Sequence, residues 1–165
     1  MAVKLDMSKA YDRVEWACLD KIMEKPGFHQ RWRVLMMQCV SSVTYSIRIN
    51  DYPRGQIVPT RGLHQGDPLS PYLFLLCADG LSALIKNAMS EGCMEGISVC
   101  KRGPSISHLF FTDDSIIFYK ASMGECKALQ RILKVYELAS GQQLNRAKTS
   151  LFFSPNTKTE IKNEI

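Results

Sequence analysis

The sequence predicts a mixed α+β fold in which helices alternate with antiparallel hairpins. Short runs that alternate apolar and polar residues recur along the chain and indicate strands. Longer stretches between them carry apolar residues at helical spacing, and turn residues join several of the strand-like runs directly. With 165 residues, of which 45% are hydrophobic, the chain suits one domain with a substantial core.

The first third of the chain predicts a strand followed by two helices. AVKLD at 2–6 alternates apolar and polar side chains and predicts a short strand. Apolar residues at helical spacing predict a helix over 8–24, with Ser8 as its N-cap. The Pro-Gly pair at 26–27 ends this helix, and a second helix is expected over 29–41.

The middle of the chain predicts a hairpin and then a buried helix. TYSIRIN at 44–50 is a strand-like run, 51–55 is turn-like, and 56–60 resembles a returning strand. Ser70 is the expected N-cap of a helix over 71–89, followed by proline at the first helical position. This helix is apolar almost all round, which predicts burial.

The last third predicts a second hairpin, a helix and a final strand. Residues 106–112 and 115–120 form the expected hairpin arms, and a helix is expected over about 124–139. TSLFF at 149–153 predicts the last strand. The polar tail, 155–165, is expected to fray.

Composition places the chain among soluble intracellular proteins, cytoplasmic or nuclear. The net charge of +5 is mild and compatible with a polyanionic partner. Six cysteines without a C-x-x-C pair indicate buried thiols in a reducing compartment. No signal peptide is recognised, and the longest apolar run, 72–85, is interrupted by Asp79 and too short for a membrane span. The apolar start indicates a chain cut from something longer.

Two adjacent carboxylates, Asp113 and Asp114, stand between apolar runs in HLFFTDDSIIFY. An ionised carboxylate withdrawn from water is very unfavourable unless it is paired or bound to a metal. From these residues alone, a solvated hairpin turn is the more common explanation because Asp is a frequent turn residue. A metal site is the alternative.

Asp6, at the end of the first strand, is a third carboxylate beside an apolar run. If that strand lies beside the hairpin, Asp6, Asp113 and Asp114 converge, roughly 4–7 Å apart without metal. Clustered carboxylates repel without cations, and Mg²⁺ is the hard ion that carboxylate and phosphate oxygens suit. Two such ions about 3.5–4 Å apart can clamp an in-line phosphoryl displacement.

The motifs of this chain resemble those of reverse transcriptases. D-x4-Y, QG-x3-SP and F-x-DD occur in the order and at the spacing of motifs A, B and C of that family. KLDMSKAYDRVEW, GLHQGDPLSPYLF and SGQQLNRAKTSLFFS are similar in particular to LINE-type, non-LTR retrotransposon enzymes of the kind abundant in plants. The resemblance covers residues 1–154 and implies the palm subdomain of an RNA-directed DNA polymerase, with an antiparallel sheet covered by helices. It favours the metal site over the solvated turn.

The resemblance implies a set of metal ligands. Asp6, with the backbone carbonyl of Met7, and Asp113 would be the main ligands of two Mg²⁺ ions, with Mn²⁺ as a possible substitute. Asp114 would be an auxiliary ligand or would orient the primer end. Lys148 would correspond to the motif D lysine that protonates the leaving pyrophosphate, although many such lysines are only surface charges.

The resemblance also implies nucleotide-binding residues. Tyr11 matches the aromatic steric gate that excludes the ribose 2′-hydroxyl; a core tyrosine of the first helix is the alternative. Gln65 and Gly66 match the motif that supports the incoming nucleotide and the template, with a bare loop as the alternative. His64 and His108 lack metal-ligand spacing and are expected to be structural.

The implied partners are an RNA template, a DNA primer, deoxynucleoside triphosphates and the missing fingers and thumb, with no membrane. Thr112 departs from the family pattern, where alanine is common. Without fingers and thumb, an inactive palm remnant of a decayed element is the main alternative. A Mg²⁺-dependent phosphohydrolase would need an Asp at Ser8, and an RNA-binding module would need exposed aromatics on central strands, so both are less favoured.

Overall fold

A computed structural model describes residues 1–98, 100, 103–111 and 114–165. Its elements, in chain order, are β1 (Ala2–Leu5), β2 (Met7–Ser8), α1 (Trp16–Glu24), α2 (Gln30–Ser41), β3 (Tyr45–Ile49), β4 (Tyr52–Ile57), α3 (Ser70–Ser90), β5 (Ile97–Ser98), β6 (Ser105–Ile106), β7 (His108–Phe111), β8 (Asp114–Phe118), α4 (Met123–Ser140), β9 (Gln143–Leu144), β10 (Ser150–Phe152) and α5 (Thr159–Glu164). The mixed α+β class predicted from the sequence is therefore correct.

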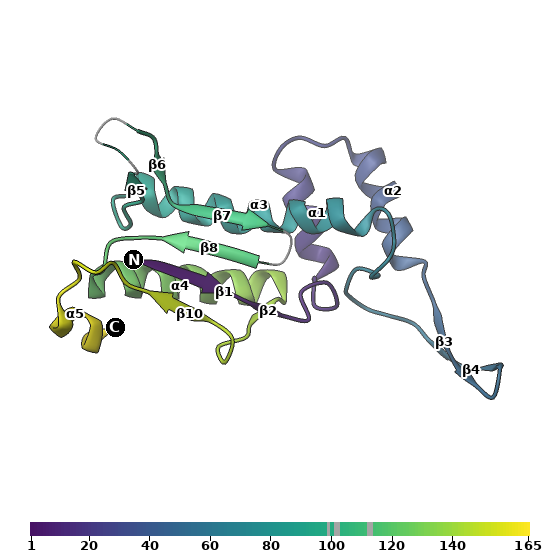
Figure 1. The fold of residues 1–165 in the computed structure, drawn as a ribbon. Coiled ribbons are helices and arrows are strands. Elements are labelled where there is room, and N and C mark those ends of the chain that lie inside the picture. The colour runs from purple at the N-terminus through teal and green to yellow at the C-terminus, as the bar shows by residue number, and fades with distance from the viewer. Residues whose placement is uncertain (99, 101–102, 112–113) are drawn as a thin grey trace.

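The central feature is a four-stranded antiparallel sheet in the order β10-β1-β8-β7 (Figure 1). β1 pairs with β8 along its whole length, from Ala2 opposite Phe118 to Leu5 opposite Ser115. On its other edge β1 pairs with β10. The prediction that the first strand lies beside the hairpin, in the centre of one sheet, is confirmed.

The two faces of this sheet differ because side chains alternate along each strand. Val3 and Leu5 of β1 and Ile117 of β8 are buried, and α3 and α4 lie behind the sheet and against each other (Figure 1). The opposite face carries Lys4 and Asp114, both about half exposed. This more open face is therefore the one that can meet a ligand.

Helix α3 packs across the sheet as predicted, but it is not buried all round. Leu73, Phe74, Cys77, Leu81 and Ile85 are buried, whereas Tyr72 is 69% and Leu75 is 52% exposed. A straight helix against one face of a sheet covers only one side of its circumference, so the prediction of complete burial is wrong. Among the described residues, α3 alone has the length and hydropathy of a membrane span, a property that buried core helices share.

The helix predicted over 8–24 is shorter than expected. α1 begins only at Trp16, with Glu15 rather than Ser8 at its N-cap position. Met7 and Ser8 form β2 instead and pair with β9, and Lys9 adopts a positive φ of 51° that a helix would not allow. A tertiary strand pair has overridden a local helical pattern.

The remaining predictions are close to the structure. α2 and α4 match their predicted ranges within one residue, and α4 has the Ser122 side chain as its N-cap and Gly141 as its left-handed C-cap. The β3–β4 hairpin turns at Asn50 and Asp51, earlier than expected, and extends away from the sheet (Figure 1). Ser70 is the first residue of α3 rather than its N-cap. In the tail, α5 forms where no regular element was expected.

Candidate active site

Two of the predicted acidic residues, Asp6 and Asp114, lie at the end of the β1–β8 strand pair. Leu5 lies opposite Ser115, so the antiparallel register carried one residue further sets Asp6 opposite Asp114. Residues 2, 4 and 6 also share a face by strand alternation, and Lys4 on that face contacts Asp114. Two of the three predicted ligands therefore come from neighbouring strand ends.

The third predicted ligand, Asp113, and its neighbour Thr112 lie outside the described residues. Within the described part of the chain, no group of three His, Cys, Asp or Glu side chains is close enough to hold a metal ion. The two carboxylates described, on adjacent strands, still provide the hard oxygen donors that Mg²⁺ or Mn²⁺ prefers. The donor set thus fits a divalent ion in chemistry, and the predicted separation of the three carboxylates stays a prediction.

A lysine that the sequence reasoning missed faces this acidic pair. Lys4 Nζ lies 3.1 Å from Asp114 Oδ1, with both side chains about half exposed. In the sequence, Lys4 looked like an ordinary polar residue on an alternating strand. Only the β1–β8 register shows that Asp114 is its charge partner.

Tyr11 lies in the loop between β2 and α1, not in a helix. Its ring stacks on the ring of Phe74 in α3, with centroids 4.6 Å apart and an interplanar angle of 14°. The side chain is half-buried, on the edge of the hydrophobic core. This position is compatible with an aromatic wall beside a ligand, because one face of the ring is held by the protein.

Gln65 and Gly66 lie in an exposed loop that reaches back to the same segment. Gln65 Nε2 is 3.5 Å from Asp12 Oδ1, one residue after Tyr11. Gly66 has a φ of +93°, which favours glycine in this turn. The loop lines a pocket of about 430 Å³ together with Asp12, Tyr45 and His64. The loop therefore lies against the segment that carries Tyr11, through the Gln65–Asp12 contact and the hydrogen bond from Leu63 N–H to the Tyr11 carbonyl oxygen.

Lys148 and Met7 flank the acidic end of the sheet on its other side. Lys148 lies in a turn that begins at Asn145, whose backbone N–H donates to the Asp6 carbonyl oxygen at 2.8 Å. Its side chain is exposed. Met7 follows Asp6 directly in β2 and pairs with Leu144 of β9. The segment with Lys148 is thus anchored to the backbone of the first predicted metal ligand.

The histidines have structural contacts. His108 Nε2 lies 2.9 Å from Ser82 Oγ, and its Nδ1 lies 2.8 Å from Ser107 Oγ. Burial, with a smaller contribution from Lys86, lowers the pKa of His108. His64 Nδ1 is 3.1 Å from the hydroxyl of Tyr45. These contacts give both histidines hydrogen-bond partners within the fold, as expected for structural residues.

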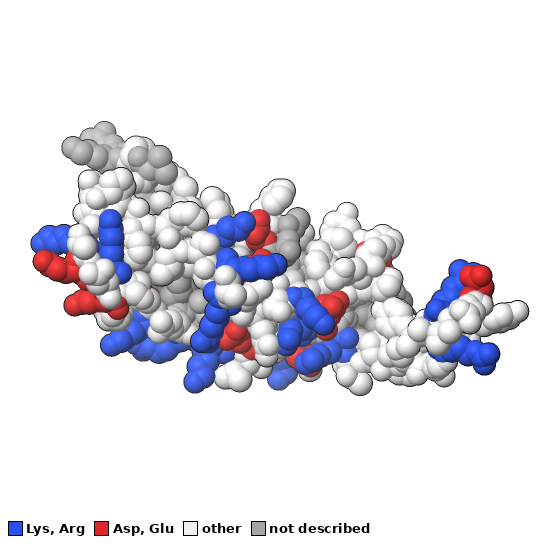
Figure 2. Space-filling view, turned by 60° about the horizontal axis from the view of Figure 1, so that its bottom comes forward, with Lys and Arg blue, Asp and Glu red and all other residues white. Residues whose placement is uncertain are grey.

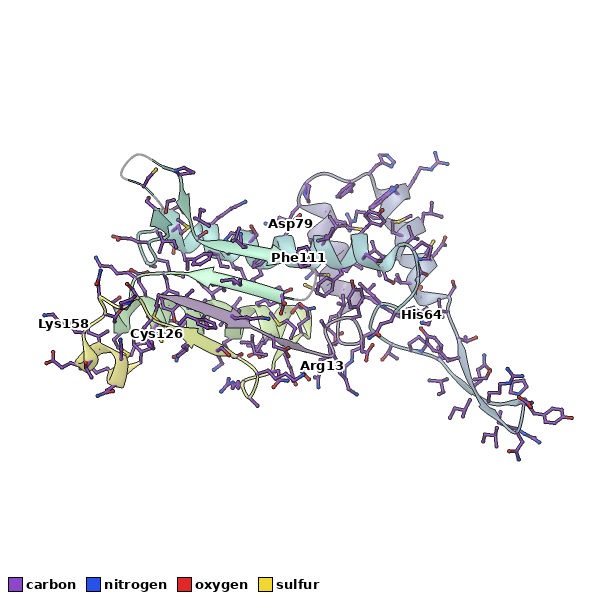
Figure 3. All side chains as sticks on the ribbon, viewed as in Figure 1. Arg13, His64, Asp79, Phe111, Cys126 and Lys158 are labelled. Atoms are coloured by element: carbon purple, nitrogen blue, oxygen red, sulfur yellow. The ribbon has the colours of Figure 1, made fainter. Side chains whose placement is uncertain are left out.

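The surroundings of the site carry mixed charge. Figure 2 brings the β10 edge of the sheet forward and shows Lys and Arg side chains over much of this face, with acidic ones among them. Figure 3 labels Arg13, His64 and Phe111, one from each predicted motif segment, in the middle part of the view.

Comparison with known proteins identifies the class to which this fold and site belong. The sequence profile of a family described as "Reverse transcriptase (RNA-dependent DNA polymerase)" matches residues 1–163. The chain belongs to the reverse transcriptase family. Its motif order and its central β1–β8 pairing agree with that assignment.

Individual relatives point to retrotransposons. The chain is 52% identical over 67 residues to an uncharacterized mitochondrial protein of Arabidopsis thaliana, AtMg01250, covering 41% of this chain and 55% of that protein. It is 28% identical over 145 residues to the Pol polyprotein of the type-2 retrotransposable element R2DM of Drosophila melanogaster, covering 87% of this chain and 13% of the polyprotein. The chain therefore spans about half of the first relative and a small part of the second.

The fold also resembles solved telomerases. A telomerase structure from Candida tropicalis, in complex with a fragment of telomeric RNA, superposes with a TM-score of 0.72 at 13% identity. The match covers 94% of this chain and 26% of that one. At this identity the likeness shows a shared reverse transcriptase fold.

Proposed function

We propose that this chain is the palm of an RNA-directed DNA polymerase of a LINE-type, non-LTR retrotransposon, transferring deoxynucleotides to a primer 3′-hydroxyl. The observation that carries the proposal is the position of β1 between β8 and β10. This order brings the end of the Asp6 strand beside Asp114 on one edge and beside the Lys148 turn on the other. Fingers and thumb belong to the parent polymerase in this proposal, because the chain spans 13% of the R2DM polyprotein.

In this proposal, each residue has the role that the matching family motif implies. Asp6 and Asp114, with Asp113 from the sequence motif, hold divalent cations; when bound, Mg²⁺ or Mn²⁺ would activate the attacking hydroxyl and neutralise phosphate charge. Tyr11 packs against the sugar of the incoming nucleotide. Gln65 and Gly66 support that nucleotide and the template base. Lys148 lies within the turn anchored to Asp6 and donates a proton to the leaving pyrophosphate.

The metal site can be tested on the chain itself. Binding of Mn²⁺ is measured by electron paramagnetic resonance for the unaltered chain and for Asp6→Asn and Asp114→Asn. We expect each substitution to weaken binding by about tenfold or more, because each removes a full negative ligand charge. Asp79→Asn, an exposed carboxylate on α3, is the control and leaves binding unchanged. Equal Mn²⁺ binding in Asp6→Asn and the unaltered chain would contradict the proposed metal site.

Catalysis is tested in a context that supplies the remaining domains. The chain replaces the matched region of the R2DM polyprotein, and primer extension is measured on an RNA template. We expect incorporation that Asp6→Asn or Asp113→Asn abolishes. The 165-residue chain alone is expected not to extend a primer, because holding the triphosphate in line with the 3′-hydroxyl supplies a large part of the rate. Extension by the isolated chain that depends on Asp113 would show that the palm suffices.

A further inference from the structure

The loop that carries Tyr11 is held by a glutamine buried in the core. Gln142 is 1% exposed, and its Nε2 donates to the carbonyl oxygen of Ala10 at 2.9 Å. Its Oε1 accepts a hydrogen bond from the hydroxyl of Tyr136, which also lies 3.2 Å from the Cys77 carbonyl oxygen. A backbone carbonyl only accepts, so the orientation of the Gln142 amide is determined: the NH₂ faces Ala10.

The tyrosine partner is suited to donate. Burial, with a further contribution from the nearby Cys77 thiol, raises the pKa of Tyr136, so its hydroxyl stays protonated at neutral pH. The Ser140 hydroxyl bonds to the backbone of the same helix turn, at the Tyr136 carbonyl oxygen. Each polar side chain of this interior group therefore has a partner, as burial requires.

Backbone hydrogen bonds hold the rest of the loop from two sides. Glu15 N–H donates to the Ser140 carbonyl at 2.8 Å. From the other side, Gly62 N–H donates to the Val14 carbonyl at 2.8 Å and Leu63 N–H donates to the Tyr11 carbonyl at 2.9 Å. Residues 10–15 belong to no helix or strand, so tertiary contacts such as these bonds and the Tyr11–Phe74 stack hold the segment in place.

Two glycines allow this close approach. A Cβ at Gly141 would lie 2.5 Å from the Arg13 carbonyl oxygen, and a Cβ at Gly62 would lie 2.7 Å from the Asp12 carbonyl oxygen. Both distances are too short for a side chain, and both neighbours are backbone atoms. Segment 10–15 therefore lies between the residues after α4 and the residues before the Gln65 loop, in contact with both.

We propose that Gln142 is a positioning residue: its amide fixes segment 10–15 and thereby the orientation of the Tyr11 ring that selects the nucleotide sugar. This inference rests on the proposed polymerase function. An apolar side chain would fill the same interior space without the desolvation of an amide, so what Gln142 adds is a directed bond to Ala10. The bond ends one residue before Tyr11, whose own carbonyl is held by Leu63.

The first test uses the chain itself and needs no activity. Amide hydrogen exchange is followed by NMR at Glu15, Gly62 and Leu63, the donors around the loop, and at Leu81 in α3. In Gln142→Met, which fills the space without a donor, we expect exchange at the three loop donors to accelerate about tenfold relative to Leu81. Gln143→Met, the same change at the exposed neighbouring position, leaves all four unchanged.

A second variant separates hydrogen bonding from packing. In Gln142→Glu, a carboxylate faces the Ala10 carbonyl and cannot donate to it, whereas the protonated acid can. Lowering the pH below the raised pKa of this buried carboxyl restores loop protection in Gln142→Glu and does not do so in Gln142→Met. Loop protection in Gln142→Glu is compared at low and neutral pH within the same variant. This comparison therefore tests the hydrogen bond even where Gln142→Met fails to fold.

The outcomes separate this inference from the proposed function. Loop exchange that is equal in Gln142→Met and Gln143→Met, or protection in Gln142→Glu that does not depend on pH, overturns the positioning role whatever the chain catalyses. In the R2DM chimera, Gln142→Met lowers discrimination between dTTP and UTP about tenfold, in the same direction as loss of the Tyr11 ring. Faster loop exchange in Gln142→Met with unaltered discrimination would overturn the link to sugar selection. Absence of Mn²⁺ binding in the unaltered chain would overturn the proposed function.

Discussion

The ammonium group of Lys4 lies 3.1 Å from a carboxylate oxygen of Asp114, across the strand pair that forms the acidic end of the sheet. The pair is about half exposed on both sides, so it contributes little to stability. Its importance lies in the local charge. A fixed positive charge beside a carboxylate competes with any cation that this carboxylate would bind.

Replacing Lys4 by Met should therefore strengthen metal binding. We expect Mn²⁺ to bind the chain on the order of three- to tenfold more tightly, because one positive charge beside Asp114 is removed. Unfolding free energy should change by less than about 1 kcal/mol. Lys120→Met, which removes an exposed lysine near Glu95, is the control. Weaker Mn²⁺ binding in Lys4→Met would show that the lysine organises the carboxylate instead of competing for it.

Tyr11 should govern sugar selection through its ring, not its hydroxyl. In the R2DM chimera, Tyr11→Phe is expected to keep discrimination between dTTP and UTP, and Tyr11→Val to relax it about tenfold or more. The stack on Phe74 holds one face of either aromatic ring in place. Mn²⁺ binding stays constant in both variants. Unchanged discrimination between dTTP and UTP in Tyr11→Val would mean that Tyr11 is only a core residue.

Gly141 should be far less replaceable than a glycine with a similar backbone angle elsewhere. Gly27 and Gly141 have φ values of +88° and +75°, but only Gly141 meets another backbone segment. Gly27→Ala is expected to lower the unfolding free energy by about 1 kcal/mol, from the left-handed conformation alone. Gly141→Ala should lower it by about 1–3 kcal/mol more, because Arg13 must move. Denaturant unfolding measures both, and equal losses would mean that the contact with Arg13 relaxes freely.

His108 should make stability depend on pH. Its pKa is lowered in the folded chain, mainly by burial, so the folded state binds fewer protons than the unfolded state. Its contribution is therefore complete above the unfolded pKa of about 6.5 and is lost as pH falls through that value toward the lower folded pKa. His108→Gln, which can bond to Ser82 and Ser107 without titrating, should flatten this part of the profile. Chemical unfolding at about pH 7.5 and 5.5 compares the two, and parallel profiles would contradict the assignment.

Local patterns in the sequence predicted several helices and strands correctly. The range of α4 was predicted from apolar residues at helical spacing, and the structure places its caps at Ser122 and Gly141. β1 and the β7–β8 hairpin were predicted from alternation. The adjacency of β1 and β8 was predicted from the acidic residues beside two apolar runs, together with the motif order of the family, and the structure confirms it.

The errors arose where a distant segment decided the local structure. Residues 8–15 have helical spacing, yet β9 and the backbone near Gly62 and Ser140 take their hydrogen bonds. The sequence did not single out Gln142, because residue type alone does not show whether a glutamine is buried or exposed. Lys4 was missed for the related reason that its partner lies on another strand.

The position of β1 in the middle of the sheet also constrains the order of folding. Its neighbours, β8 and β10, are made more than a hundred residues later in the chain. Contacts of such large sequence separation form slowly, because closing a long loop costs conformational entropy before the contacts can stabilise the fold. During synthesis on the ribosome, β1 and Asp6 are therefore made before the strands that pair with β1. The helices between β1 and β8 in the chain can pack while β1 is still unpaired. Once Ser150–Phe152 has emerged, the nascent chain can pair both edges of the strand that precedes Asp6.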